Sequence, residues 1–449
     1  MTGRYKAYPD YKESGIDWLY DIPAHWKTIP VGRCYHRVKR TGFESEELLS
    51  VYRDHGVIPK SSRDDNNNKA SDDLSPYQLV CENNLVMNKM KAWQGSIAIS
   101  EYRGIVSPAY FVYEPFKHTE SIVYPKYVHY LLRHPIYITQ YMSRSKGIRV
   151  NQWDLDPESF QSIELLLPLK EEQQKIINFL DHETAKIDTL IAKQEKLIEL
   201  LKEKRQAVIS HSVTKGLNPD APMKDSGVEW LGDVPEHWLT PRIKQIVDIP
   251  VTDGPHETPT FVDSGVPFVS AEAVSKGFVD FNKIRGFITE KQNAIYSKKY
   301  APKKYDIYMV KSGATTGVTA IVETNDIFNI WSPLAVIRCK KDYSPYFVLN
   351  FMRSNEFMKA VELNWSFGTQ QNIGMGVIEN LHIACPPIQE AIDIANYLQS
   401  KMAKYELLIE HANKQIAFMK ERKTALISAA VTGKIDVRDW QEPTYQESA

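Results

Sequence analysis

The chain has 449 residues, more than one hydrophobic core normally organises, so roughly two to four domains are expected. Its 55 lysines and arginines balance 56 aspartates and glutamates. This balance argues against a polycation that coats nucleic acid through overall charge, and it confines any DNA contact to local patches.

Cysteine usage and hydropathy narrow the class of protein further. The four cysteines, at positions 34, 81, 339 and 385, form neither a CxxC pair nor a spacing suited to zinc, so reduced thiols and no metal site are expected. The amino-terminal segment lacks an apolar signal core, and no run approaches the ~18 apolar residues of a membrane span. We therefore expect a soluble, cytoplasmic protein with no membrane partner.

The chain contains an internal repeat. Residues 12–26 return as residues 224–238, an offset of 212 positions (224 − 12), with nine of the fifteen residues identical. Residues 178–180 and 207–210 return in similar form as residues 396–398 and 425–428, with an offset of 218 (396 − 178). Two copies of one unit predict approximate two-fold symmetry, which the backbone of double-stranded DNA shares.

A long mixed stretch of short β-prone runs, separated by glycine and proline, follows each opening segment. The runs are residues 84–88, 96–100, 109–113 and 163–168 in the first copy, and 267–270, 306–310, 319–322, 334–338 and 381–386 in the second. Each stretch is expected to form an α+β domain around an irregular sheet.

Two segments, residues 171–212 and 389–430, contain neither proline nor glycine. Each predicts a helix of about 40 residues, or about 60 Å at about 1.5 Å per residue. Apolar residues follow both helices in heptad register: Leu180, Ile187, Leu190, Leu197, Leu201 and Val208, with Ile191 and Ile198 beside them, and Leu398, Tyr405, Met419 and Leu426, with Leu408, Ile409 and Ile416 beside them.

These stripes predict that the two charged helices bury their apolar sides against each other. Gln194 and Ala412 then occupy equivalent positions in the seam. Pseudo-two-fold symmetry with an intervening globular domain favours an antiparallel pair. An ordinary interdomain helix pair, whose stripe is only core, is the alternative.

In this order the motifs resemble the DNA specificity subunits of type I restriction-modification systems. The resemblance rests on residues 14–26, 226–238, 207–214 and 425–434, and it covers nearly the whole chain. It implies an α+β fold: two α/β target-recognition domains separated by two long helices that form an antiparallel coiled coil, with a pseudo-two-fold internal repeat. The implied boundaries are residues 1–168 and 218–386 for the domains, 169–217 and 387–435 for the helices, and 436–449 for a carboxy-terminal tail.

The resemblance also implies the function. Such a subunit reads a split sequence in double-stranded DNA and docks two methyltransferase (M) subunits and, in the full complex, two restriction/translocase (R) subunits. It does no catalysis, and S-adenosylmethionine, ATP and Mg are expected only in the partner subunits. Because the two recognition stretches differ while the opening segments and helices agree, the target should be asymmetric and bipartite.

The sequence itself contains no motif for either catalytic chemistry. A glycine-rich cofactor turn with an Asn/Asp-Pro-Pro-aromatic run is not found, and residues 311–317 lack the Gly-Lys-Ser/Thr ending of a nucleotide-binding loop. Two other functions remain as alternatives. One is a coiled-coil protein adaptor without DNA sequence readout, and the other is an all-in-one methyltransferase or nuclease.

Candidate DNA-binding residues follow from the chemistry of base and phosphate recognition. Arginine and lysine suit guanine, asparagine and glutamine suit adenine, and cations suit phosphates. In the first domain the candidates are Arg144, Lys146, Arg149, Asn151 and Gln152, with Lys89, Lys91 and Arg103 as secondary candidates. In the second domain they are Thr369, Gln370, Gln371 and Asn372, with His256, Lys311, Thr315 and Thr316 as secondary candidates.

The resemblance places DNA-facing loops in both stretches, and exposed polar loops without a function are the alternative. The matched tryptophans Trp26 and Trp238 are interpreted as packing elements rather than base readers. Helices of about 60 Å, against about 3.4 Å per base pair, keep two half-sites within about two turns of DNA.

Overall fold

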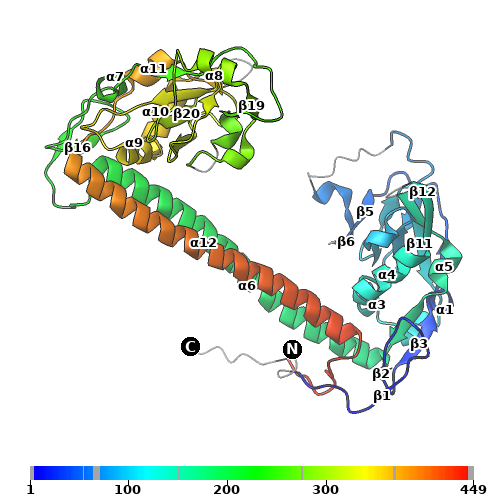
Figure 1. Cartoon of the computed structure of the whole chain (residues 1–449). Coiled ribbons are helices and arrows are strands. Elements are labelled where there is room, and N and C mark those ends of the chain that lie inside the picture. Colours follow the sequence, from blue (N-terminus) through cyan, green and yellow to red (C-terminus); the bar gives the residue numbers. More distant parts are fainter. Residues whose placement is uncertain are drawn as a thin grey trace. The chain divides into compact units, whose positions relative to one another are not determined.

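The computed structural model describes residues 5–53, 55–63, 71–149, 152–274, 277–367 and 371–442. The chain divides into two units, Met1–Lys193 with Gln415–Ala449, and Gln194–Lys414. Each unit combines one domain of helices and strands with parts of two long helices, α6 (Lys170–Lys215) and α12 (Ile388–Val431) (Figure 1). This arrangement confirms the predicted fold class.

The first unit is built on an antiparallel sheet of four strands in the order β4-β11-β8-β9. These strands are β4 (Tyr35–Val38), β8 (Leu85–Asn88), β9 (Ile97–Ile99) and β11 (Tyr110–Pro115). Successive side chains of β8 enter different cores, with Leu85 and Met87 in one apolar cluster and Val86 in another. The sheet is therefore buried on both faces at β8 and β9, whose residues are almost entirely apolar, whereas the edge strand β4 is partly exposed.

Helices and short strand pairs surround this sheet. The helices are α1 (Val31–Cys34), α2 (Thr119–Ile122), α3 (Pro125–Leu132), α4 (Pro135–Arg144) and α5 (Pro157–Gln161). The strand pairs are β1 (Tyr11–Lys12) with β2 (Ile22–Pro23), β3 (Lys27–Pro30) with β14 (Glu164–Leu167), β5 (Leu49–Tyr52) with β6 (Gly56–Pro59), β7 (Gln78–Val80) with β10 (Gly104–Val106), and β12 (Ser145–Arg149) with β13 (Gln152–Leu155).

The second unit repeats the same central sheet, in the order β17-β23-β20-β21. Its strands are β17 (Thr252–Asp253), β20 (Ile307–Val310), β21 (Thr319–Ile321) and β23 (Leu334–Ile337). One main-chain bond shows the equivalence: Lys89 N donates to Ala109 O at 3.1 Å, and Lys311 N donates to Pro333 O at 2.8 Å. The two domains therefore share a frame that their strand sequences hardly reveal.

The remaining elements of the second unit correspond in part to those of the first. The helices are α7 (Ile243–Ile246), α8 (Glu290–Tyr296), α9 (Pro345–Phe351), α10 (Asn355–Asn364) and α11 (Met375–Asn380). The strands are β15 (Met223–Asp225) with β16 (Asp233–Pro235), β18 (Val266–Val269) with β19 (Gly286–Ile288) and β22 (Asn329–Ile330), and β24 (Ser366–Phe367) with β25 (Gln371–Asn372).

One predicted strand of the second unit is not continuous. Residues 381–386 make only isolated bridges, between Leu239 and Cys385 and between Arg242 and His382. Pro241 lies between these bridges on the opposite segment and has no N–H to complete the ladder, although its carbonyl accepts from Ile383 N at 2.9 Å.

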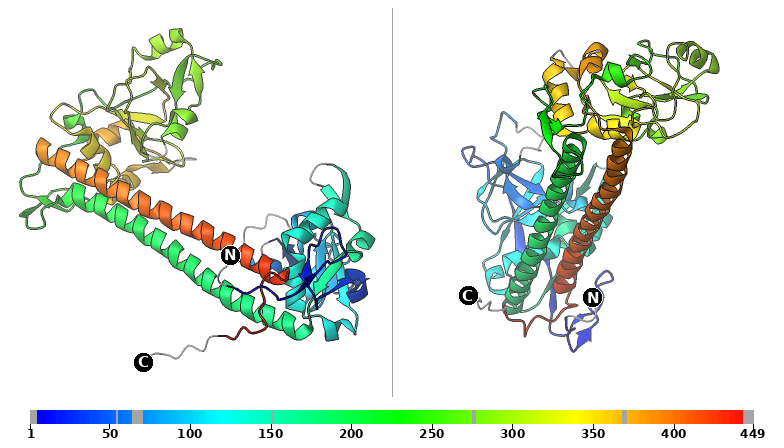
Figure 2. Two further views of the ribbon diagram at one scale, coloured as in Figure 1. Left: turned by 60° about the horizontal axis from the view of Figure 1, so that its bottom comes forward. Right: turned by 90° about the vertical axis from the view of Figure 1, so that its left-hand side faces the viewer.

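The long helices pack against each other in opposite directions within each unit. In the first unit the start of α6 shares a core with the end of α12, and Lys423 Nζ lies 2.7 Å from Asp188 Oδ2. In the second unit the end of α6, at Val213, shares a core with the start of α12, at Leu398. Figure 2 shows the two helices side by side from two further directions. The predicted antiparallel pairing is confirmed.

The predicted register of the seam needs a correction. Leu190, Leu197 and Leu408 are 50%, 43% and 50% exposed, whereas Ile198 and Ile416 are buried. The apolar stripe on each helix is wider than the seam. After Ile187 the next seam residue can therefore be either Leu190, three positions on, or Ile191, four positions on. Packing against the partner helix places Ile191 in the seam and leaves Leu190, Leu197 and Leu408 on the outer surface.

Each opening segment is attached to the start of the long helix that follows its domain. Trp26 Nε1 donates to Glu172 Oε1 at 3.0 Å, and His25 Nε2 lies 2.7 Å from Glu172 Oε2. The second unit repeats both contacts, at 3.1 and 2.7 Å, through Trp238, His237 and Glu390. Both tryptophans are fully buried, which confirms their interpretation as packing elements.

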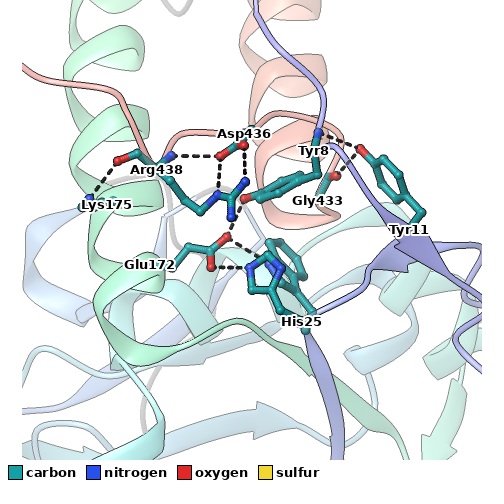
Figure 3. A network of polar contacts seen from close by, with 9 residues as sticks. Tyr8, Tyr11, His25, Glu172, Lys175, Gly433, Asp436 and Arg438 are labelled. Carbon is teal, nitrogen blue, oxygen red and sulfur yellow. Dashed lines mark hydrogen bonds and ion pairs between the residues drawn. The ribbon is translucent and has the colours of Figure 1, made fainter.

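In the first unit the segment after α12 joins this junction (Figure 3). Tyr8 Oη donates to Glu172 Oε1 at 2.6 Å, and Tyr11 Oη donates to Gly433 O at 3.0 Å. Arg438 donates to both carboxylate oxygens of Asp436, whose own N–H bonds to Lys6 O. The two ends of the described chain are thus packed into one unit.

Candidate nucleic-acid interface

In the first unit the structure brings two of the predicted sites together. The loop between β8 and β9, residues 89–96, lies against β13, because Leu155 N donates to Lys89 O at 3.2 Å. The rings of Trp93 and Trp153 add a contact with their centroids 4.9 Å apart. Lys91 is exposed on this loop, so its ammonium group and the β12–β13 hairpin share one region of the surface.

The main candidates of the first domain lie on the β12–β13 hairpin and at Arg144, the last residue of α4 directly before it. Arg149 pairs with Gln152 in its register, Lys146 is exposed, and the Arg144 guanidinium donates to the side chain of Gln140. Asn151 lies outside the described residues. A two-stranded ribbon has the dimensions to enter a major groove, and its sequence combines cationic and amide residues that suit base edges.

Arg103 lies apart from these residues. The β8–β9 loop leaves one end of the strand pair, whereas Arg103 follows β9 and lies at the other end. Its Nε donates to Glu46 Oε1 at 2.8 Å. The structure therefore assigns Arg103 an ion pair outside the surface on which the other candidates meet.

In the second unit the equivalent loop lies against the equivalent hairpin. Ile373 N donates to Lys311 O at 2.8 Å, and Gly313 N donates to Gln371 O at 3.0 Å. Thr316 is buried, and its hydroxyl donates to Gly313 O at 2.8 Å, so this side chain braces the loop. Thr315 is exposed, as is Asn372 on β25. Thr369 and Gln370 lie outside the described residues.

His256 joins the same surface through a residue that the sequence did not single out. His256 Nε2 lies 3.1 Å from Asp253 Oδ2, and Lys311 Nζ lies 3.2 Å from the same oxygen. Lys299, which follows α8, reaches Asp253 Oδ1 at 2.5 Å. Among the described candidates, Lys311, Thr316, Gln371 and His256 thus belong to one site, which Lys299 and Asp253 complete.

The charge state of Asp253 follows from its surroundings. Burial acts to raise the pKa of this carboxyl group, but hydrogen bonds from Lys299 and Lys311 outweigh burial and hold the pKa below its ordinary value. The carboxylate is therefore ionised at neutral pH. Its position, two residues before the proline of a Gly-Pro turn, was the only sequence signal that could have identified it.

The two sites carry groups of the kinds that proteins use to contact nucleic acid. Cations and backbone N–H groups suit phosphates, and the amide residues beside them suit base edges. No group of three or more His, Cys, Asp or Glu side chains in the described part of the chain could hold a metal ion. No helix among these residues has the length and apolar character needed to cross a membrane.

Comparison with known proteins shows which family the chain is similar to. Residues 235–423 match the family model of the type I restriction modification DNA specificity domain. The type I restriction enzyme EcoKI specificity subunit of Escherichia coli K12 is 20% identical over 438 residues, which cover 92% of this chain and 90% of that protein. The MjaVIII specificity subunit of Methanocaldococcus jannaschii is 23% identical over 445 residues, which cover 96% and 98%.

Two solved structures share the fold. A chain from a type I restriction-modification system, studied for its complex assembly and conformational transition, has a TM-score of 0.68 at 15% identity, over 93% of this chain and 100% of its own. The HsdS subunit of Thermoanaerobacter tengcongensis has a TM-score of 0.54 at 16% identity, over 93% and 99%. With the internal repeat and the paired long helices, the family model, the relatives and the solved structures all support a DNA specificity subunit of a type I restriction-modification system, and proteins of that name are the non-catalytic components of such systems.

Proposed function

We propose that this specificity subunit reads an asymmetric, bipartite DNA target, with one half-site for each unit. The observation that carries this proposal is that both units repeat one main-chain arrangement of loop and hairpin but carry different residues on it. In both units a loop that begins with a lysine, Lys89 or Lys311, lies against a short hairpin. The first hairpin carries Lys146 and Arg149, whereas the second carries Gln371 and Asn372. Different donors on one frame favour different bases in the two half-sites.

The long helices are the proposed docking surface for the methyltransferase subunits. Two hollows adjoin these helices: one of about 840 Å³ lies along α6 in the first unit, and one of about 600 Å³ lies between α12 and the domain of the second unit, where Phe278, Tyr346 and Arg353 also line it. Equivalent positions of the two helices line them: Asn178, Asp181 and Ala185 in the first, and Asn396, Gln399 and Ala403 in the second. Leu190 and its equivalent Leu408 are both half exposed beside charged residues. A surface that occurs twice fits two copies of one partner.

The chemistry belongs to the partner subunits in this proposal. S-adenosylmethionine is bound by the two M subunits, and ATP and Mg by two R subunits in the full complex. The specificity subunit contributes the target and the geometry. Because α6 and α12 are continuous over 46 and 44 residues, their length sets the spacing between the half-sites.

The test is base-resolution mapping of methylated adenines in cells that express this chain with its neighbouring methyltransferase, compared with cells that lack the chain. We expect a split, asymmetric motif that appears only when the chain is present. The Gln371→Ala variant should relax one half of that motif and leave the other half unchanged.

The coiled-coil adaptor makes the opposite prediction. An adaptor that binds only proteins would leave the methylation pattern unchanged when it is deleted, and Gln371→Ala would have no effect on DNA binding. A motif that depends on the chain but is symmetric would contradict the assignment of different half-sites to the two units.

A further inference from the structure

One polar network outside the helix junctions is centred on Asp253. This carboxylate is 0% exposed, yet it contacts three side chains that carry or can carry positive charge. The distances are 2.5 Å to Lys299 Nζ, 3.2 Å to Lys311 Nζ and 3.1 Å to His256 Nε2. Lys299 Nζ also donates to Gly254 O at 3.1 Å. Lys299 donates a hydrogen bond to Oδ1, and Lys311 and His256 lie at ion-pair distance from Oδ2.

The surrounding charges exceed what Asp253 neutralises. Two lysines face one carboxylate, which leaves a surplus of positive charge even when His256 is neutral. Lys299 and His256 remain 47% and 68% exposed, so this surplus reaches the surface. A purely structural ion pair would be expected to match its charges, because an unmatched charge near the interior is costly. The surplus therefore favours an external anion.

The position of the network indicates which anion that is. The main chain of Lys311 accepts from Ile373 N at 2.8 Å, directly after the proposed reading residues Gln371 and Asn372. The cationic groups thus lie at the base of the second hairpin. On a duplex, the sugar-phosphate backbones border the grooves that expose base edges, and half or more of all protein–DNA hydrogen bonds go to them.

The first unit does not repeat this network. Asp253 pairs with Ala335 in the second sheet. The equivalent place in the first sheet, beside Phe111, belongs to Lys39, which follows the last paired residue Val38. A lysine at that place cannot hold other lysines, so the network is specific to the second unit.

We propose that Asp253 is a positioning residue that arranges three side chains as a binding site for a DNA backbone phosphate in the second half-site: Lys299, Lys311 and His256. This inference rests on the proposed function. The phosphate contact sets the register of the second hairpin on the duplex, and the bases are read by other residues. Asp253 itself does not touch DNA.

The experiment uses the complex of this chain with its methyltransferase and a duplex that carries the mapped target. The variants are Asp253→Asn and Lys299→Gln, and the control is Lys298→Gln, which removes the same charge from the exposed neighbouring position. Binding is measured as a function of salt. Two further duplexes, each with one half-site scrambled, show which half-site is affected.

We expect Lys299→Gln to weaken binding several-fold, to reduce the slope of log K against log salt by about one, and to leave the mapped motif unchanged. Asp253→Asn should weaken binding more, because it releases three side chains at once. Both effects should disappear on the duplex whose second half-site is scrambled. Lys298→Gln should bind like the unmodified complex.

Two results would overturn the proposal. Lys299→Gln could match Lys298→Gln in both affinity and salt slope, or either variant could change which bases are methylated in the second half-site. Thermal unfolding shows whether Asp253→Asn is folded, and if it is not, Lys299→Gln decides alone. Failure of the proposed function itself would look different, because the unmodified chain would then direct no motif at all.

Discussion

His134 Nε2 lies 2.6 Å from Ser428 Oγ, so the start of α4 is joined to the end of α12 within the first unit. His134 Nδ1 accepts from Ile136 N at 3.1 Å and caps α4, which leaves the proton of the neutral ring on Nε2. The second unit makes an equivalent connection, because Ser210 Oγ accepts from Asn355 N at 2.8 Å. The repeated serines therefore serve one structural purpose in both copies.

This contact predicts a pH dependence for the first unit. Burial, assisted by the positive charge of Lys434, lowers the pKa of His134 to about 4. An unfolded histidine titrates near ~6.5, so between about pH 6.5 and 4 the unfolded state binds more protons and stability falls as the pH falls. Burial lowers the pKa of His129 to about 4 as well.

The measurement is thermal unfolding of the first unit across this pH range. His134→Asn keeps a capping acceptor but cannot titrate. We expect the stability of this variant to decline less steeply as the pH falls, because about one proton fewer is taken up on unfolding. The decline that remains should come from His129. An identical slope in the variant and the unmodified protein would contradict the assignment.

The junctions between opening segments and long helices provide a matched pair of variants. Glu172 is 6% exposed and accepts from three side chains, whereas Glu390 is 32% exposed and contacts two. Glu172→Gln should destabilise the first unit by about 1–3 kcal/mol, and Glu390→Gln should destabilise the second unit by less. Hydrogen exchange of the helix amides would measure both, with exposed Glu171→Gln as the control. Equal effects of all three variants would contradict the proposed role of Glu172 and Glu390 in the two junctions.

Gly433 tests whether the segment after α12 packs tightly against the opening segment of the first unit. Its φ of +75° disfavours other residues, and an added Cβ would lie 2.5 Å from Pro23 Cδ. Gly42 has a φ of +90° but an added Cβ there would meet nothing within 4 Å. Both changes to alanine share the backbone strain, so Gly433→Ala should destabilise the unit by an additional ~1–3 kcal/mol from the clash. Equal losses of thermal stability would mean that the segment after α12 moves freely.

The exposed leucines test the docking surface. Leu190→Ser and Leu408→Ser remove apolar area from the outer sides of the helices. Both side chains are half exposed, so the changes should alter the free energy of folding little. We expect each variant to weaken the binding of one methyltransferase subunit and the double variant to weaken both. Titration with purified methyltransferase measures the stoichiometry, and exposed Lys193→Ser is the control. Full binding of two subunits by the double variant would place the docking surface elsewhere.

The helix lengths test the spacing proposal. Removal of seven residues from the middle of both α6 and α12 keeps the heptad register while it shortens each helix by about 10 Å. The preferred spacer between half-sites should then shorten, or binding should be lost. Methylome mapping with the shortened chain checks this, and an unchanged spacer would show that helix length does not set the spacing.

Local sequence was sufficient for the long helices and for most of the strands. The absence of proline and glycine from residues 171–212 and 389–430 depends on no distant partner, and α6 and α12 extend slightly beyond both segments. The burial of Trp26 and Trp238 also followed from their repetition. In contrast, Leu190 and Leu408 were assigned to or beside the seam, because an apolar stripe wider than its partner contains more than one register.

The sequence by itself determined that the chain is duplicated, that each copy ends in a long amphipathic helix, and where polar recognition stretches occur. These features are local, or they repeat along the chain. Only the tertiary structure decided which of the candidates share a surface. It placed Lys311 beside Gln371, left Arg103 at the far end of a strand pair, and buried Asp253 among cations from distant segments. Such neighbours are set by strand register and loop packing, which depend on contacts between residues far apart in sequence.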